Sequence, residues 1–81
     1  MAHASARHTD RLCTALQRYL AAHPRAADTA QGILACWLPP GAFPHAADDI
    51  DAALARLVAE RWLHERRLPG GNILYAANPE R

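Results

Sequence analysis

The side chains that could carry out chemistry are two cysteines, five histidines and a run of acidic residues. Catalysis needs a nucleophile, a base oriented toward it and a concave site for the substrate. Cys13 and Cys36 lack the CxxC spacing of a zinc or redox site, and no spaced pair of histidines accompanies them. The glycine pair Gly70-Gly71 follows a proline and indicates a turn, not a phosphate-binding loop. These residues predict no enzyme, no metal site and no cofactor.

The basic residues are the next candidates for a function. All nine are arginines, and the formal net charge is only +1, so charge alone does not favour non-specific binding of nucleic acid. Arginines near a turn or along a helix can still contact phosphates. A solvated position is the alternative interpretation for each of them. The candidates for nucleic-acid contacts are Arg11, Arg18, Arg66 and Arg67.

The length of 81 residues allows one domain with a thin core. The segment Met1–Thr9 lacks the apolar region of a signal peptide, and no apolar run approaches the roughly 20 residues that a membrane span requires. We therefore expect a cytoplasmic protein with no membrane partner. In that compartment Cys13 and Cys36 are expected to be buried, reduced thiols.

The first half of the chain predicts two helices joined by a short extended segment. Residues 1–8 carry no pattern and are expected to form a disordered tail, and residues 9–78 a single domain. Thr9 and Asp10 suit a helix start, and this helix should end near Ala22 because His23 precedes a proline. Arg25–Asp28 should be short and extended. Thr29 or Asp28 should cap a second helix, Ala30–Leu38, in which Gly32 indicates a close contact.

The second half predicts a third helix and a β-hairpin. Ala47–Leu63 has the clearest amphipathic pattern, and Asp48 with Asp51 resembles a capping box at its start. An alternating strand should run from Trp62 to Leu68, and a turn at Pro69-Gly70-Gly71 should return the chain as strand Ile73–Ala77, with Tyr75 opposite the first strand. The proline-rich loop before the third helix should fold Phe43 onto the core. The predicted core comprises Leu16, Leu20, Ile33, Leu54, Leu57, Val58 and Leu63.

The stretch LARLVAERWLHERRLPGGNILYA resembles the recognition helix, turn and wing of winged helix-turn-helix proteins, and the resemblance covers roughly Thr9–Ala77. It implies a mainly α fold of three helices with a small antiparallel hairpin as the wing. It also implies a first, very short strand at Arg25–Asp28 that covers the edge of the hairpin. In that superfamily the third helix enters the DNA major groove and the wing contacts the backbone or minor groove. One departure is that Arg61 stands where a glycine commonly follows the third helix.

The outward face of the third helix departs further from a DNA-reading surface. A helix that reads base edges needs Arg, Asn, Gln, Ser or Thr near its N-terminus, and here acidic residues and alanines take these positions. Small residues allow another backbone to approach, although an alanine-rich composition explains them equally well. We expect an interaction module that binds a protein partner or a second copy. The alternative is a DNA-binding regulator that uses the third helix and wing arginines. The expected partner-binding residues are Asp48, Ala52, Ala55, Arg56 and Ala59.

Overall fold

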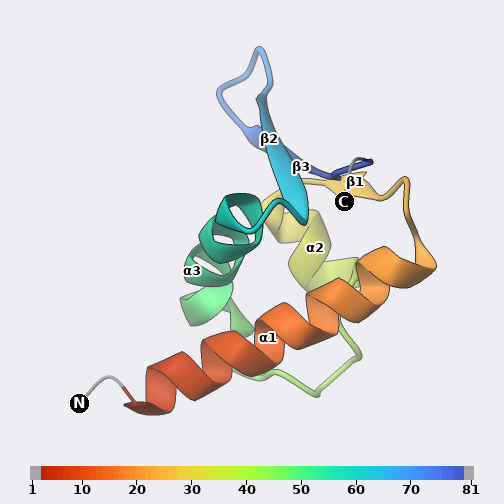
Figure 1. Ribbon diagram of the computed structural model, residues 1–81. Helices are drawn as coiled ribbons and strands as arrows, with labels where there is room; N and C mark the ends of the chain where they lie inside the picture. The colour runs from red at the N-terminus through yellow and green to blue at the C-terminus, as the bar shows by residue number, and fades with distance from the viewer. Residues whose placement is uncertain (1–2, 80–81) are drawn as a thin grey trace.

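A computed structural model of the chain describes residues 3–79, with side chains from residue 7 onward. Three helices pack together, and a small antiparallel sheet rises from one end of them, so that α1 and the tip of the hairpin lie at opposite ends of the molecule (Figure 1). About half of the chain is helical, as the sequence predicted. The elements in order are α1 His3–Ala22, β1 Ala27–Asp28, α2 Ala30–Cys36, α3 Ala46–Ala59, β2 Leu63–Arg67 and β3 Ile73–Ala77.

The sheet has the strand order β1-β3-β2, and both pairings are antiparallel. The short strand β1 lies beside β3 and closes one edge of the hairpin, as the resemblance implies, but it covers only Ala27–Asp28 of the expected segment. Glu65 of β2 and Asp28 of β1 both lie opposite Tyr75 of β3. At the turn, the Leu68 N–H donates to the Asn72 carbonyl over 2.8 Å, and the Gly71 N–H donates to the Leu68 carbonyl over 3.0 Å. The last strand of the chain is therefore the middle strand of the sheet.

One hydrophobic core joins the three helices and the base of the hairpin. Leu12, Leu16, Leu54 and Leu57 are essentially inaccessible to solvent. Six of the seven predicted core residues are buried, whereas Val58 is only half-buried because it lies at the edge of the inward face of α3. Phe43 folds back and packs against this core, as predicted. The buried residues are Leu12, Cys13, Leu16, Leu20, Ile33, Trp37, Leu38, Ala46, Ile50, Ala53, Leu54, Leu57 and Leu63.

The predicted start of the first helix was wrong. Helix α1 begins at His3, so Thr9 lies inside it and does not cap it. The expected tail of residues 1–8 is thus helical from His3 onward, and residues 1–2 lie outside the described residues. The alanines of this segment have the highest helix propensity, and no proline or glycine interrupts it. The predicted end at Ala22 is confirmed.

Helix α2 begins as predicted and ends earlier. The Thr29 hydroxyl accepts a hydrogen bond from the Gly32 N–H over 3.3 Å, which makes Thr29 the N-cap. The carboxylate of Asp28 accepts a bond from the Thr29 N–H over 2.8 Å and occupies the space where a Cβ on Gly32 would lie. The glycine is therefore required by a close approach, as expected. The helix ends at Cys36 instead of Leu38, and Trp37 is its C-cap.

Helix α3 begins at Ala46, one residue earlier than predicted, and ends at Ala59, four residues before the predicted end at Leu63. His45 is its N-cap residue and makes no side-chain capping bond, so Asp48 lies within the first turn and the predicted capping box does not form. Asp48 and Asp49 instead place negative charge near the positive end of the helix dipole. The inward residues of this helix, including Ile50, Ala53 and Leu57, are buried. The predicted amphipathic pattern is thus confirmed between these corrected ends.

The chain leaves α3 through a tight turn at Arg61, which has a φ of 65°. The Arg61 N–H donates to the Val58 carbonyl over 3.1 Å, and the Trp62 N–H donates to the Leu57 carbonyl over 2.9 Å. This pair of bonds is the Schellman motif, whose left-handed residue is usually glycine. Arg61 therefore occupies the left-handed position after the third helix, where a glycine is common. The turn also explains why β2 begins at Leu63 and not at Trp62.

Replacing Leu57 with alanine should destabilise the protein by about 2–5 kcal/mol, since its side chain is fully buried between the helices. The matched control is Leu68→Ala, at the end of the hairpin and outside the core, which should cost under about 0.5–1 kcal/mol. Urea denaturation measured by circular dichroism gives both values. Equal effects of the two substitutions would show that the assigned phase of α3 is incorrect.

The contact at Gly32 gives a second prediction. Alanine in an ordinary helix position is favoured over glycine by about 1 kcal/mol. Gly32→Ala should not deliver this gain, because the Asp28 carboxylate must leave its place and its bond to the Thr29 N–H. In an Asp28→Ala background the same substitution should become stabilising, with a coupling of about 1 kcal/mol or more in a double-mutant cycle. A coupling of zero would contradict the observed contact.

Candidate functional site

The outward face of α3 is formed by four of the predicted residues. Asp48, Ala52, Ala55 and Ala59 recur every three or four positions and are all exposed. This face is opposite the buried side of the helix. It is a narrow surface of methyl groups with a carboxylate at its N-terminal end. We call these four residues the alanine face.

Arg56, the fifth of the predicted partner-binding residues, is engaged in two ion pairs within the molecule and is therefore not available to a partner. Its guanidinium contacts the Asp10 carboxylate of α1, and its Nε lies 3.2 Å from the Glu60 carboxylate one turn along α3. The hydrogen bond to Asp10, followed by that to Glu60, raises the pKa of Arg56 above its usual range. Arg56 therefore links α1 to α3 across the surface, and its charge is balanced within the molecule.

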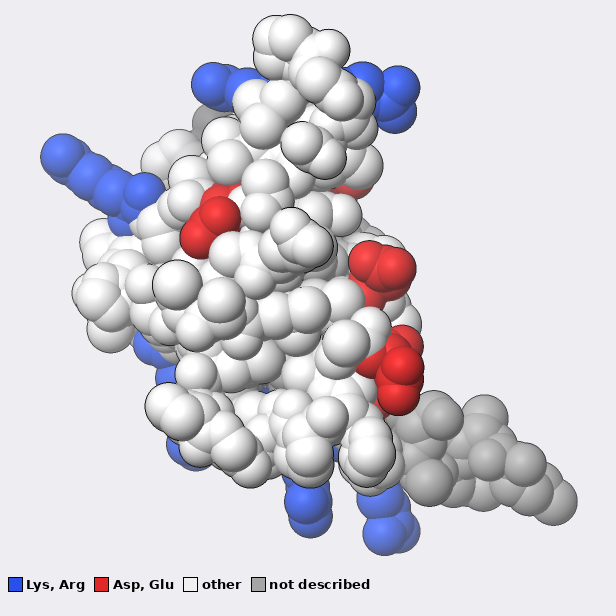
Figure 2. All heavy atoms as spheres, turned by 180° about the vertical axis from the view of Figure 1, so that it is seen from behind, with Lys and Arg blue, Asp and Glu red and all other residues white. Residues whose placement is uncertain are grey.

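The four predicted nucleic-acid arginines do not form one surface. Arg66 and Arg67 are exposed on β2, whereas Arg11 and Arg18 are exposed on α1. Figure 2 shows basic side chains over the hairpin at the top and over the opposite end of the molecule, with acidic side chains between them. The molecule is 36 Å long in its greatest dimension. A nucleic acid that contacted both pairs of arginines at once would have to cross the acidic side chains between them.

The two cysteines have different surroundings. Cys13 is buried, and its thiol lies 3.7 Å from the Ala53 carbonyl, toward which it can donate. Burial raises the pKa of this thiol above its usual value, and the nearby Arg56 opposes that effect only in part. Cys36 is exposed at the end of α2, so the expectation of two buried thiols was wrong for this residue. Ile33 of α2 and the C-cap residue Trp37 face the core, whereas Cys36 lies off this buried face.

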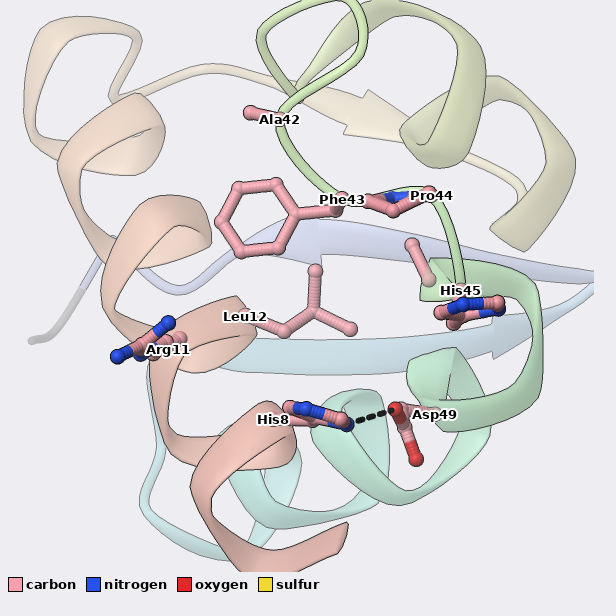
Figure 3. Close-up of a pocket in the computed structure, with 9 residues that line it drawn as sticks. His8, Arg11, Leu12, Ala42, Phe43, Pro44, His45 and Asp49 are labelled. Atoms are coloured by element: carbon pink, nitrogen blue, oxygen red, sulfur yellow. Dashed lines mark ion pairs between the residues drawn. The ribbon is translucent and has the colours of Figure 1, made fainter. Parts of the chain in front are cut away.

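A hollow that the sequence did not predict lies between α1, the loop before α3 and the first turn of α3 (Figure 3). Its volume is about 180 Å³. Leu12 and Phe43 face one another across it, and His8 and Asp49 lie on its border with 4.0 Å between Nδ1 and Oδ2. Because the lining comes from three separate segments, no local sequence motif predicts the hollow. The helical spacing of His8, Arg11 and Leu12 was the one signal in the sequence.

A second hollow of about 330 Å³ lies between the start of α2 and the hairpin turn. Thr29, Gln31, Asn72 and Tyr75 give it an uncharged, polar lining. Tyr75 has a raised pKa, chiefly because of burial, and stays neutral at ordinary pH. This hollow offers hydrogen-bonding groups but no acid, base or nucleophile suited to catalysis.

Within residues 3–79, no three histidine, cysteine or acidic side chains come together as metal ligands would. Over the same residues, no helix has both the length and the apolar character needed to cross a bilayer.

The difference between the cysteines predicts selective thiol chemistry. In the folded protein at pH 8, Cys36 should react rapidly with a thiol reagent such as dithionitrobenzoate, because it is exposed. Cys13 should react much more slowly, because it is buried and its raised pKa leaves less thiolate. Cys36→Ser should remove the rapid phase, and denaturant should expose the remaining thiol. Two rapid phases of equal size in the native protein would contradict this assignment.

The chain was also compared with known proteins. No protein-family model, no curated protein and no solved structure matches it. The geometry of its own surfaces is therefore the basis for proposing a function.

Proposed function

We propose that this protein is a small, non-enzymatic winged-helix module that binds another protein through α3, as an accessory or regulatory subunit. The observation that carries the proposal is the alanine face: an exposed helix surface of small side chains on a helix whose outward arginine, Arg56, is engaged in ion pairs. Small residues on a helix allow close approach of another backbone, and a flat surface loses little side-chain entropy on binding.

The order of elements supports the winged-helix part of the proposal. A helix, a short strand, two further helices and a hairpin follow one another, and the short strand pairs with the return strand of the hairpin. Helix α3 passes directly into β2 through the turn at Arg61. These features support the proposal that α3 is presented beside a wing, as in winged-helix proteins.

The charges around α3 favour a protein partner over DNA. Asp48 and Asp51 are exposed and Asp49 is half-buried in the first turns of the helix. Carboxylates in this position would face phosphates if the helix entered a groove, and they are repelled by them. The alanines offer no donor or acceptor to base edges. Neither direct readout nor backbone attraction is therefore available to this face.

The alternative function is a DNA-binding regulator that uses the wing. It is favoured by one observation, the exposure of Arg66 and Arg67 on β2, where wing arginines could contact phosphates. Glu65 is exposed beside them and reduces the local positive charge. This alternative needs the α3 face to approach DNA without reading it.

Ala55→Arg distinguishes the two functions. A large charged side chain in the middle of the alanine face should weaken self-association or partner binding at least about tenfold, through steric clash and the cost of burying a charge. Folding should be unchanged within about 0.5 kcal/mol, because the position is outside the core. The matched control is Ala35→Arg, which adds the same charge at an exposed position of α2 and should leave association intact.

Sedimentation velocity measures self-association, affinity capture with mass spectrometry identifies a partner, and a duplex-DNA titration at low salt measures DNA binding. Association that Ala55→Arg abolishes and Ala35→Arg preserves would support the proposal. Salt-sensitive DNA binding at micromolar or tighter affinity, unaffected by Ala55→Arg and lost in Arg66→Gln/Arg67→Gln, would overturn it in favour of the regulator.

A further inference from the structure

The hollow between α1 and the loop before α3 is a separate feature from the alanine face, since it is lined by the other side of the first turn of α3. We propose that it binds a small organic carboxylate whose apolar group is compact, such as an aromatic ring. This site makes no use of the alanine face, so it can be tested whether or not α3 binds a protein.

The inner wall of the hollow is apolar. Leu12 from α1 and Phe43 from the loop line it, with Pro44 next to Phe43 (Figure 3). Ala46 of α3 also belongs to the lining. Leu12 and Ala46 are buried and belong to the core, and Phe43 packs against that core. These positions are fixed by packing, so the wall exists before a ligand arrives. A volume of about 180 Å³ admits a single ring or a branched side chain and little more.

The border of the hollow carries an arginine and two histidines. Arg11 and His8 lie one helical turn apart on α1, and His45 lies at the start of α3. Asp49 is the acidic group of the lining, and His8 is placed beside it at 4.0 Å. Within the described residues Arg11 makes no ion pair. Its guanidinium is thus the cation at this border that is left to bind an anion.

An apolar wall with an uncompensated guanidinium at its border matches an amphipathic monoanion. A carboxylate accepts a charge-assisted bond from Arg11 in the paired geometry that guanidinium favours. The apolar group of the ligand then displaces water from the wall of Leu12 and Phe43. A cationic ligand would meet Arg11, and a larger polyanion would meet Asp49, so both classes fit less well.

The same chemistry could come from a free carboxylic acid or from the C-terminus of a peptide that ends in an apolar residue. The probes are therefore benzoate, its neutral isostere benzamide, and a tetrapeptide ending in leucine as the free acid and as the amide. Each is titrated into ¹⁵N-labelled protein while amide chemical shifts are recorded. Tighter binding of benzoate or of the free-acid peptide identifies the source.

We expect millimolar binding of benzoate, with shifts centred on Leu12, Phe43 and Ala46, and no comparable binding of benzamide. Arg11→Gln should weaken binding about tenfold, the loss expected for one charge-assisted bond. The matched control Arg18→Gln removes an exposed arginine two turns further along α1, outside the hollow, and should leave binding unchanged. Asp49→Asn should strengthen binding, since it removes the acidic group beside the anion.

Several outcomes would overturn the proposal. These are shifts centred away from the hollow, equal binding of the carboxylates and their neutral isosteres, or equal weakening by Arg11→Gln and Arg18→Gln. Because both arginines are exposed on α1, thermal melts of the two variants should agree with the wild type, which separates a lost contact from a lost fold.

Discussion

The packing of α1 against α3 is the contact on which the rest of the molecule depends. Leu12 and Leu16 meet the buried side of α3, and the thiol of Cys13 lies against the Ala53 carbonyl. Ala53 is fully buried, and because its side chain is only a methyl group the two helices can approach closely. A domain of this size has few large apolar side chains, so one well-packed helix pair supplies much of its burial. Helix α2 and the hairpin pack against this helix pair.

The same helix pair decides which charges are available at the surface. Arg56 and Asp10 join the helices, and Glu60 completes the group. Exposed ion pairs contribute little to stability on their own. Their larger effect here is to neutralise a positive charge on the outward side of α3, while Arg11 and Arg18 on α1 and Arg66 and Arg67 on the hairpin make no ion pair within the described residues. The structure thus separates a helix face of alanines and carboxylates from two basic ends.

The sequence predicted the features that depend on local patterns. Helical spacing identified the inward residues of α3, the Thr29 cap fixed the start of α2, and the Pro-Gly-Gly turn set the hairpin. Errors arose where one local signal was given too much weight. Thr9 resembled a cap, but an alanine-rich segment simply continues the helix past it, and Asp48 resembled a cap although it lies within the helix.

The candidate site was less predictable because it depends on contacts between distant segments. The alanine face could be predicted, since exposure follows directly from the phase of a helix. The pairing of Arg56 with Asp10 could not, because the two residues lie 46 positions apart and only the packing angle of α1 brings them together. The hollow at Phe43 likewise needs three segments to meet, and the sequence shows only that Phe43 would fold inward.

The position of β3 as the middle strand affects how the chain is made. Strand β1 pairs only with β3, and β3 is the last element in the sequence. At about 5–20 residues per second, several seconds separate the synthesis of these two partners on the ribosome. During that interval the Ala27–Asp28 segment has no strand to pair with. The inward sides of α1 and α2 are exposed until α3 has been synthesised and packs against them. The nascent chain therefore exposes apolar surface until α3 has been synthesised, and the sheet forms only after the synthesis of β3.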